Sequence, residues 1–131
     1  MTSGARLDVC YVRRLIKPMN QLQRFRETSA TYRKHGWRLE RVLMRTETLA
    51  ELREAEGDDA RFEGAATQEA PVDAMWFGRA SHGGREAWEL RLVAEPPYAL
   101  FELFEKDEAE EEREDVRREM EARLREYTAR D

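Results

Sequence analysis

The fold is decided by residues 72–105, whose sequence is VDAMWFGRASHGGREAWELRLVAEPPYALFELFE. This stretch contains three runs rich in aromatic and aliphatic residues. They are separated by Gly-Gly at 83–84 and Pro-Pro at 96–97, both typical of turns. In the middle run, residues 86–95, apolar and charged residues alternate, as in a strand with one buried face and one solvated face. The stretch therefore predicts a meander of three antiparallel strands.

The residues before this stretch predict a strand and then a helix. Residues 6–16 are rich in Leu, Val, Ile and Tyr and predict a strand. Pro18 is expected to end this strand, because proline has no backbone N–H to donate. Over residues 19–34, apolar side chains recur three or four positions apart, which predicts an amphipathic helix.

Residues 37–56 leave two interpretations open. We favour a strand at 37–45 followed by a short helix at 48–56. Thr48 and the Glu three positions later are spaced as a capping box for that helix. The alternative is one long helix, because apolar residues here also recur with helical spacing. Residues 57–71 show neither period and predict a loop.

Residues 107–130 predict a long, highly charged helix, with Asp107 as its N-terminal cap. Acidic residues crowd its first turns and arginines its last, which suits the helix dipole. Only a narrow apolar seam is available for packing, formed by Val116, Met120, Leu124 and Tyr127. We therefore expect the helix to dock by its second half and to project its first turns into solvent.

These elements predict a single α+β domain over residues 1–131. Its expected architecture is a mainly antiparallel sheet of about five strands that ends in the three-strand meander. An early amphipathic helix and the long charged C-terminal helix complete it. A chain of 131 residues has the usual size of one domain.

The composition points to a protein of the cytoplasm. Hydrophobic residues make up 40% of the chain, and no run approaches the roughly 20 apolar residues that cross a bilayer. The N-terminal residues lack the basic and apolar regions of a secretory signal. Cys10 is the one cysteine, which excludes an internal disulfide and suggests a buried thiol.

No pattern of catalytic or cofactor-binding residues is present in the sequence. Neither of the two histidines, His35 and His82, has a His, Cys or acidic neighbour at metal-ligand spacing. The glycines at 83–84 join two predicted strands and lack the following helix that a phosphate-binding loop needs. We therefore expect no enzyme activity, no metal and no cofactor.

The charge of the chain is strongly polarised. Residues 1–46 contain eleven Lys or Arg and three Asp or Glu, a net charge of +8, although the whole chain has −5. The basic residues can form a patch for nucleic-acid phosphates, or they can pair with the acidic remainder of the chain. The candidate patch consists of Arg13, Arg14, Lys17, Arg24, Arg33, Lys34, Arg38 and Arg41.

Large apolar residues occupy both faces of the predicted strands. Three of them are consecutive at 75–77, so helices cover both faces of the sheet or one face binds a partner. The candidate protein interface consists of Met75, Trp76, Phe77, Phe101, Val116, Met120, Leu124 and Tyr127. We therefore expect a protein-interaction module, an adaptor or a small subunit, that binds a protein partner or itself. Nucleic-acid binding and small-ligand binding are the alternatives.

Overall fold

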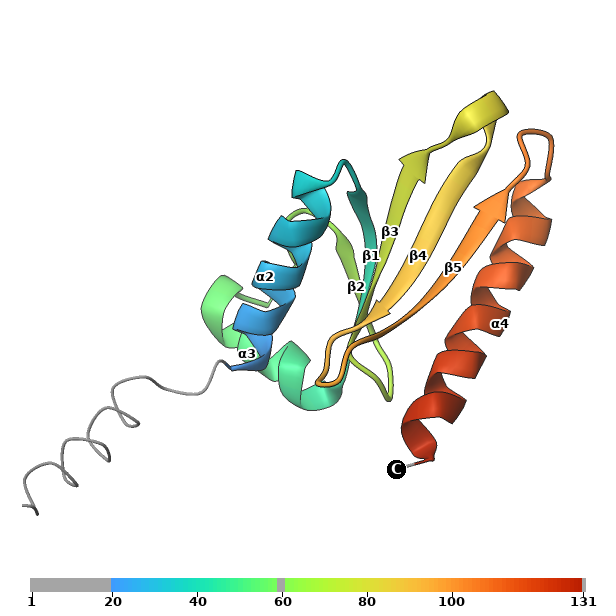
Figure 1. The fold of residues 1–131 in the computed structure, drawn as a ribbon. Coiled ribbons are helices and arrows are strands. Elements are labelled where there is room, and N and C mark those ends of the chain that lie inside the picture. Colours follow the sequence, from blue (N-terminus) through green and yellow to red (C-terminus); the bar gives the residue numbers. More distant parts are fainter. Residues whose placement is uncertain (1–19, 59–60, 131) are drawn as a thin grey trace, which may run out of the picture.

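The structure, a computed structural model, describes residues 20–58 and 61–130 (Figure 1). The predicted strand at 6–16, and Cys10 within it, lie outside these residues. The described elements are α2 (Gln21–Lys34), β1 (Arg38–Met44), α3 (Thr46–Glu56), β2 (Ala66–Glu69), β3 (Ala74–Ala80), β4 (Glu86–Leu92), β5 (Tyr98–Phe104) and α4 (Glu110–Ala129). A short 3-10 turn, His82–Gly84, joins β3 to β4.

The strands form one mixed, mostly antiparallel sheet in the order β2-β1-β3-β4-β5. β1 and β2 are parallel, whereas the other neighbouring pairs are antiparallel. β3, β4 and β5 follow one another in the chain and are also neighbours in the sheet. The α+β prediction with a long C-terminal helix is confirmed.

Helices cover both faces of the sheet, but not to the same extent. α2 and α3 lie on one face, near β1, and α4 lies on the other face along β5 (Figure 1). Alternate residues of β3 therefore enter two different cores. Met75 and Phe77 pack under α2 and α3, whereas Trp76 packs under α4.

α2 begins at Gln21, two residues after the predicted start, and ends at Lys34, as predicted. The side chain of Asn20 accepts a hydrogen bond from the backbone N–H of Gln23 at 2.8 Å, and the Gln23 side chain accepts one from the backbone N–H of Asn20. This reciprocal pair satisfies two N–H groups that have no partner within the helix. At the other end, Gly36 has φ +87°, a conformation that glycine adopts without steric cost.

The favoured interpretation of residues 37–56 is confirmed: β1 is followed by α3. Val42 and Leu43 are both buried and enter opposite cores, which an extended strand between two helical layers allows. The predicted cap is wrong, however, because α3 begins two residues before Thr48 and has no side-chain cap. The Thr48 hydroxyl donates instead to the buried carboxylate of Asp73, at 2.9 Å.

The predicted loop at 57–71 contains the edge strand β2, so this prediction is wrong for Ala66–Glu69. All four residues of β2 are exposed or half-buried, which explains why no apolar alternation marks the strand. Before β2, the buried ring of Phe62 packs edge-on against Phe25 of α2, with ring centroids 5.7 Å apart.

Two predictions about the C-terminal helix are wrong. The helix begins at Glu110 with Ala109 as its cap, so Asp107 does not cap it. Its first turns do not project into solvent, because Arg113 and Arg117 contact the sheet and their side chains are only 13% and 2% exposed. Long arginine side chains have apolar stems, and these provide the packing surface that the acidic first turns lack.

Candidate functional site

Seven of the eight predicted interface residues belong to the cores or pack under α4. Met75, Trp76 and Phe77 are buried beneath the helices on the two faces of β3, so a partner cannot contact them. The same holds for the seam of α4, because Met120 and Leu124 are also buried against the chain's own sheet.

The remaining two seam residues are half-buried, and one interface residue is exposed. Val116 and Tyr127 pack against the core under α4, and the Tyr127 ring stacks on Tyr98 of β5 with centroids 3.7 Å apart. Phe101 of β5 is different, because 58% of the residue is exposed. Among the described residues, it is the only large hydrophobic residue that is exposed. The interface prediction is therefore reduced to the surroundings of Phe101.

Phe101 is exposed because α2 and α3 cover only part of their face of the sheet. Phe101 pairs with Glu89 of β4, which in turn pairs with Phe77 of β3, so all three side chains lie on the α2 side. The Tyr32 ring of α2 stacks on Phe77, with centroids 4.0 Å apart, and its hydroxyl donates to Glu89. Within the described residues, the helical cover ends at Tyr32.

We call the uncovered region the β5 surface; it comprises the outer edge of β5 and three side chains on the α2 side of that strand. Those side chains belong to Ala99, Phe101 and Leu103, which alternate with residues that face α4. β5 has a neighbour on one side only among the described strands. The β5 surface thus combines an apolar face with a strand edge.

An open depression of about 420 Å³ lies beside Phe101, on the side toward β3. Trp37 and His82 line it together with Phe101, and the Arg79 guanidinium lies over the Trp37 ring at 5.3 Å from its centroid. The mixture of aromatic and cationic groups suits the binding of a side chain from another molecule.

Among the described residues, neither histidine has the partners of a catalytic group. His35 Nδ1 lies 2.9 Å from the backbone oxygen of Thr31, and His82 is exposed in its turn. In the described ranges, no group of three or more His, Cys, Asp or Glu residues is placed to hold a metal ion.

Next to the β5 surface, the hydroxyl of Tyr32 in α2 contacts two charged side chains of β4. Tyr32 is half-buried, and its hydroxyl lies between Glu89 and Arg91, 3.4 Å from the arginine. Burial first, and then the hydrogen bond with Glu89, raise the pKa of Tyr32 to about 12. Tyr32 is therefore neutral at physiological pH and fixes the side chain of Glu89.

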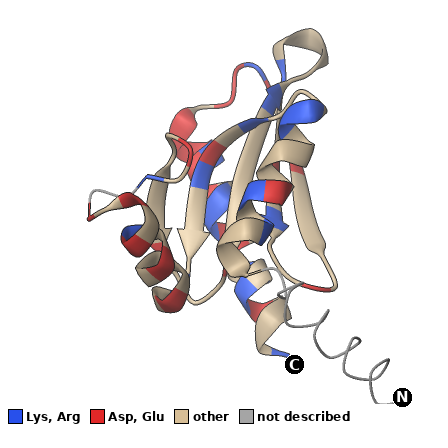
Figure 2. Ribbon diagram, turned by 90° about the vertical axis from the view of Figure 1, so that its left-hand side faces the viewer, with Lys and Arg blue, Asp and Glu red and all other residues tan. Residues whose placement is uncertain are grey.

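Three of the four described arginines of the predicted basic patch pair with carboxylates. Arg33 lies 2.8 Å from Glu63, and Arg38 lies 3.3 Å from Glu40. Arg41 pairs with Glu114. In Figure 2, Lys and Arg are interspersed with Asp and Glu along the ribbon. Internal pairing thus accounts for these three charges.

The other members of the predicted patch are distributed differently. Arg24 is half-buried and lines a cavity at the end of the sheet, and Lys34 is exposed in the last turn of α2. Arg13, Arg14 and Lys17 lie outside the described residues. Within residues 20–58 and 61–130, the structure therefore does not bring the basic residues of the patch together as one surface.

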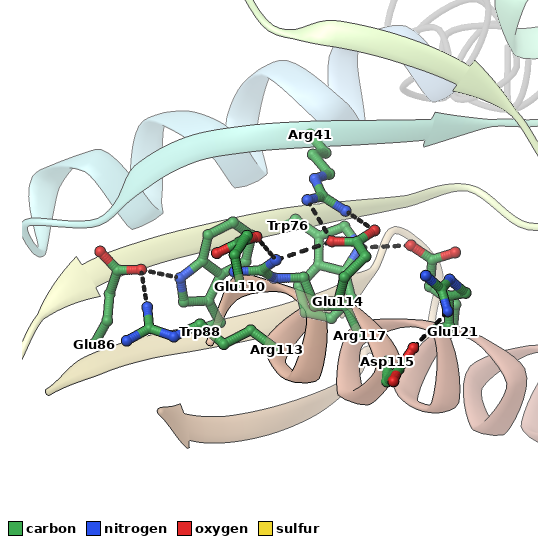
Figure 3. Close-up of polar contacts among 11 residues, drawn as sticks. Arg41, Trp76, Glu86, Trp88, Glu110, Arg113, Glu114, Asp115, Arg117 and Glu121 are labelled. Carbon is green, nitrogen blue, oxygen red and sulfur yellow. Dashed lines mark hydrogen bonds and ion pairs between the residues drawn. The ribbon is translucent and has the colours of Figure 1, made fainter. Parts of the chain in front are cut away.

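The most elaborate polar arrangement lies between α4 and the sheet, and we call it the α4 ion-pair cluster (Figure 3). Its members are Arg41, Glu110, Glu114 and Arg117. Arg41 donates two hydrogen bonds to the Glu114 carboxylate, at 2.9 and 2.8 Å. Arg117 donates to Glu114 at 2.9 Å and to Glu110 at 2.7 Å.

Aromatic rings surround the buried guanidinium of this cluster. The Arg117 guanidinium carbon lies 3.9 Å from the centroid of the Trp88 ring and 5.2 Å from that of Phe104. A cation over an aromatic face is stabilised by the ring quadrupole, more so when it is desolvated. The ring nitrogens of Trp88 and Trp76 donate to Glu86 and Glu121, at 2.7 and 2.8 Å.

The cluster holds α4 in place, and both of its carboxylates are engaged by arginines. Each carboxylate of the α4 ion-pair cluster accepts a hydrogen bond from an arginine, and no cavity opens onto it among those described. The sequence contains a signal for ion pairs within α4, since Glu110, Glu114 and Arg117 recur at intervals of three and four residues on one helix face. Their partners Arg41 and Trp88 are distant in sequence, so the signal did not reveal burial.

Glu114 is expected to make the stability of the fold sensitive to acid. The hydrogen bonds from Arg41 are the main reason that the pKa of Glu114 falls from its ordinary 4.5 to about 2. Its contribution is therefore complete above pH 4.5 and is lost as the pH falls toward 2. Urea unfolding should show that Glu114→Gln destabilises the fold at pH 7 and that this difference shrinks between pH 4.5 and pH 2.

The matched control for this measurement is Glu119→Gln, because Glu119 is exposed on the same helix. The control should leave the unfolding free energy nearly unchanged at both ends of the pH range. A difference between the native chain and Glu114→Gln that stayed constant from pH 7 to pH 2 would contradict the assignment.

A cavity of about 580 Å³ is open and lies at the end of the sheet opposite the β3–β4 turn. Its lining includes Arg24, Arg45, Asp73 and Tyr127. The Asp73 carboxylate is occupied by the chain itself, since it accepts hydrogen bonds from the Arg45 backbone N–H at 2.8 Å and from the Gln21 side chain at 3.0 Å. The cavity thus has room for a ligand, but its buried acid already has partners.

Comparisons with known proteins found no protein that resembles this chain. None of the described helices is both long and apolar enough to span a membrane. No protein-family model, no curated protein and no solved structure was found to match the chain.

Proposed function

We propose that this protein is an interaction module, an adaptor or small subunit, that binds a protein partner through the β5 surface. The observation that carries the proposal is the 58% exposure of Phe101 at the centre of an edge strand. Large aromatic residues that lie exposed beside a depression are typical anchors of protein interfaces. The function follows from the surface, since the fold alone does not imply one.

The edge of β5 supports the same proposal. Edge strands expose unpaired N–H and C=O groups, and monomeric proteins commonly block them with proline, lysine or bulges. β5 reads YALFELF and contains neither proline nor lysine, and its pairing with β4 runs without interruption from Tyr98 to Phe104. Such an edge is open to the addition of a strand from a partner.

The alternatives receive less support from the described residues. Nucleic-acid binding requires a basic surface, whereas Arg33, Arg38 and Arg41 pair with carboxylates. Catalysis requires a nucleophile or base with a partner that activates it. The described histidines lack such partners, and Asp73 is fully engaged with Arg45, Thr48 and Gln21.

Photo-crosslinking in the native cell tests the proposal. A photoreactive phenylalanine analogue at position 101 should give a defined adduct with a protein, because the side chain lies within the proposed interface. The same analogue at Ala50, an exposed residue of α3, is the matched control. Adducts at 101 that are missing at 50 would support the proposal, whereas identical adduct patterns, or none at either position, would overturn it.

A further inference from the structure

We infer that the partner at the β5 surface is a second copy of this chain, paired antiparallel through β5. The inference rests on the proposed function and names its partner. Two identical strand edges can join about a two-fold axis, so that each copy contributes the same patch. The requirement is that the strand be complementary to itself when one copy runs in the opposite direction.

β5 meets this requirement when the two-fold axis passes through Phe101. The strand reads YALFELF, and the axis places Phe101 opposite its own copy. Ala99 then lies opposite Leu103, and Tyr98 lies opposite Phe104. Aromatic and aliphatic residues thus face each other across the junction, and such cross-strand pairs stabilise antiparallel sheets.

The one charged residue of β5 favours the same register. With the axis at Phe101, Glu102 faces Leu100 of the other copy, and all seven residues of the strand are paired. An axis through Glu102 would place two carboxylates directly opposite each other, which is destabilising. An axis through Leu100 would leave Leu103 and Phe104 beyond the end of the partner strand.

The uncovered face explains why a second copy suits this site. The pairing places Ala99, Phe101 and Leu103 of both copies side by side on the α2 side of one continuous sheet, because alternate residues share a face. Each Phe101 then has an apolar neighbour from the other copy. The depression lined by Trp37 and His82 lies next to this strip. α4 covers the opposite face of β5, where Tyr127 stacks on Tyr98.

Disulfide trapping in the full chain tests the pairing and its register, with Cys10→Ser as the background. Under mild oxidation Phe101→Cys should give a covalent dimer, because the two cysteines lie opposite each other. Ala99→Cys alone and Leu103→Cys alone should not, because four residues of strand separate each cysteine from its copy by about 14 Å, which is beyond disulfide reach. An equimolar mixture of these two variants should again give the dimer.

Ala50→Cys, on the exposed side of α3, is the control for random collision. Equal dimer formation by Ala50→Cys and Phe101→Cys would overturn the inference. Equal crosslinking by Ala99→Cys alone and by the mixture would overturn the register.

Sedimentation velocity of the untagged full chain provides an independent test without cysteines. The chain should change from monomer to dimer with rising concentration, and Phe101→Lys should weaken the dimer at least about tenfold, because an edge lysine opposes strand addition. Ala50→Lys should leave association unchanged, and circular dichroism should show both variants folded.

A chain that remained monomeric up to about 0.1 mM, a concentration at which even weak complexes form, would overturn the second copy as partner. Adducts of Phe101 with a different protein in that case would leave the proposed function intact. The absence of both dimer and adduct would remove both.

Discussion

Replacing Arg117 with alanine is expected to destabilise the fold by about 2–5 kcal/mol, because it removes a large buried side chain together with its ion pairs. The Arg117 side chain is 2% exposed, donates to Glu110 and Glu114, and lies against the Trp88 ring. The variant loses the ring contact and leaves a gap under α4. Urea unfolding followed by tryptophan fluorescence measures the change directly.

The adjacent residue provides the matched control. Arg118 lies one position further on α4, is 66% exposed, and pairs with exposed Asp115 at 2.7 Å. Arg118→Ala should change the unfolding free energy by no more than about 0.5–1 kcal/mol, because exposed ion pairs contribute little. Similar losses in Arg117→Ala and Arg118→Ala would contradict the role assigned to the α4 ion-pair cluster.

Replacing Asp73 with alanine is expected to destabilise the fold by about 3 kcal/mol, because one buried and two partly buried donors lose their acceptor together. The Asp73 carboxylate accepts hydrogen bonds from the Arg45 backbone at 2.8 Å, from the Thr48 hydroxyl at 2.9 Å and from the Gln21 side chain at 3.0 Å. It therefore joins the starts of α2 and α3 to the beginning of β3.

Amide hydrogen exchange can locate the effect of this substitution. In Asp73→Ala, the first turns of α2 and α3 should lose protection before α4 does, because α4 packs on the other face of the sheet. Asp115→Ala, which removes an exposed carboxylate of α4, is the control and should be nearly neutral. A uniform loss of protection over the whole domain would contradict the local role of Asp73.

The fold could be predicted from the sequence wherever apolar alternation and turn residues coincide. β4 meets this condition, because Trp88, Leu90 and Leu92 are buried while Glu89 and Arg91 between them are only half-buried. α2 meets the corresponding condition for a helix. β2 does not, because its four residues are largely exposed and its pairing with β1 is parallel and non-local.

The candidate site was harder to predict, because burial depends on which elements cover a strand. Trp76 and Phe101 look alike in the sequence, since each is a large aromatic residue in an apolar strand. In the structure, helices bury Trp76 completely, whereas Phe101 is exposed at the sheet edge. Likewise, Arg117 resembles its neighbours in a charged helix, and only the packing of α4 on Trp88 distinguishes it.

The central claim is that the edge of β5 is open in the isolated chain and is covered by a partner. Amide hydrogen exchange of the full chain, measured in dilute and in concentrated solution, tests it most directly. In dilute solution, alternate amides of Tyr98–Phe104 should exchange rapidly while those of β4 stay protected, because β4 has neighbours on both sides. In concentrated solution, a second copy should protect the β5 amides as well. Amides of β5 that were already as protected as those of β4 in the dilute monomer would show that the edge is covered, and would contradict the account.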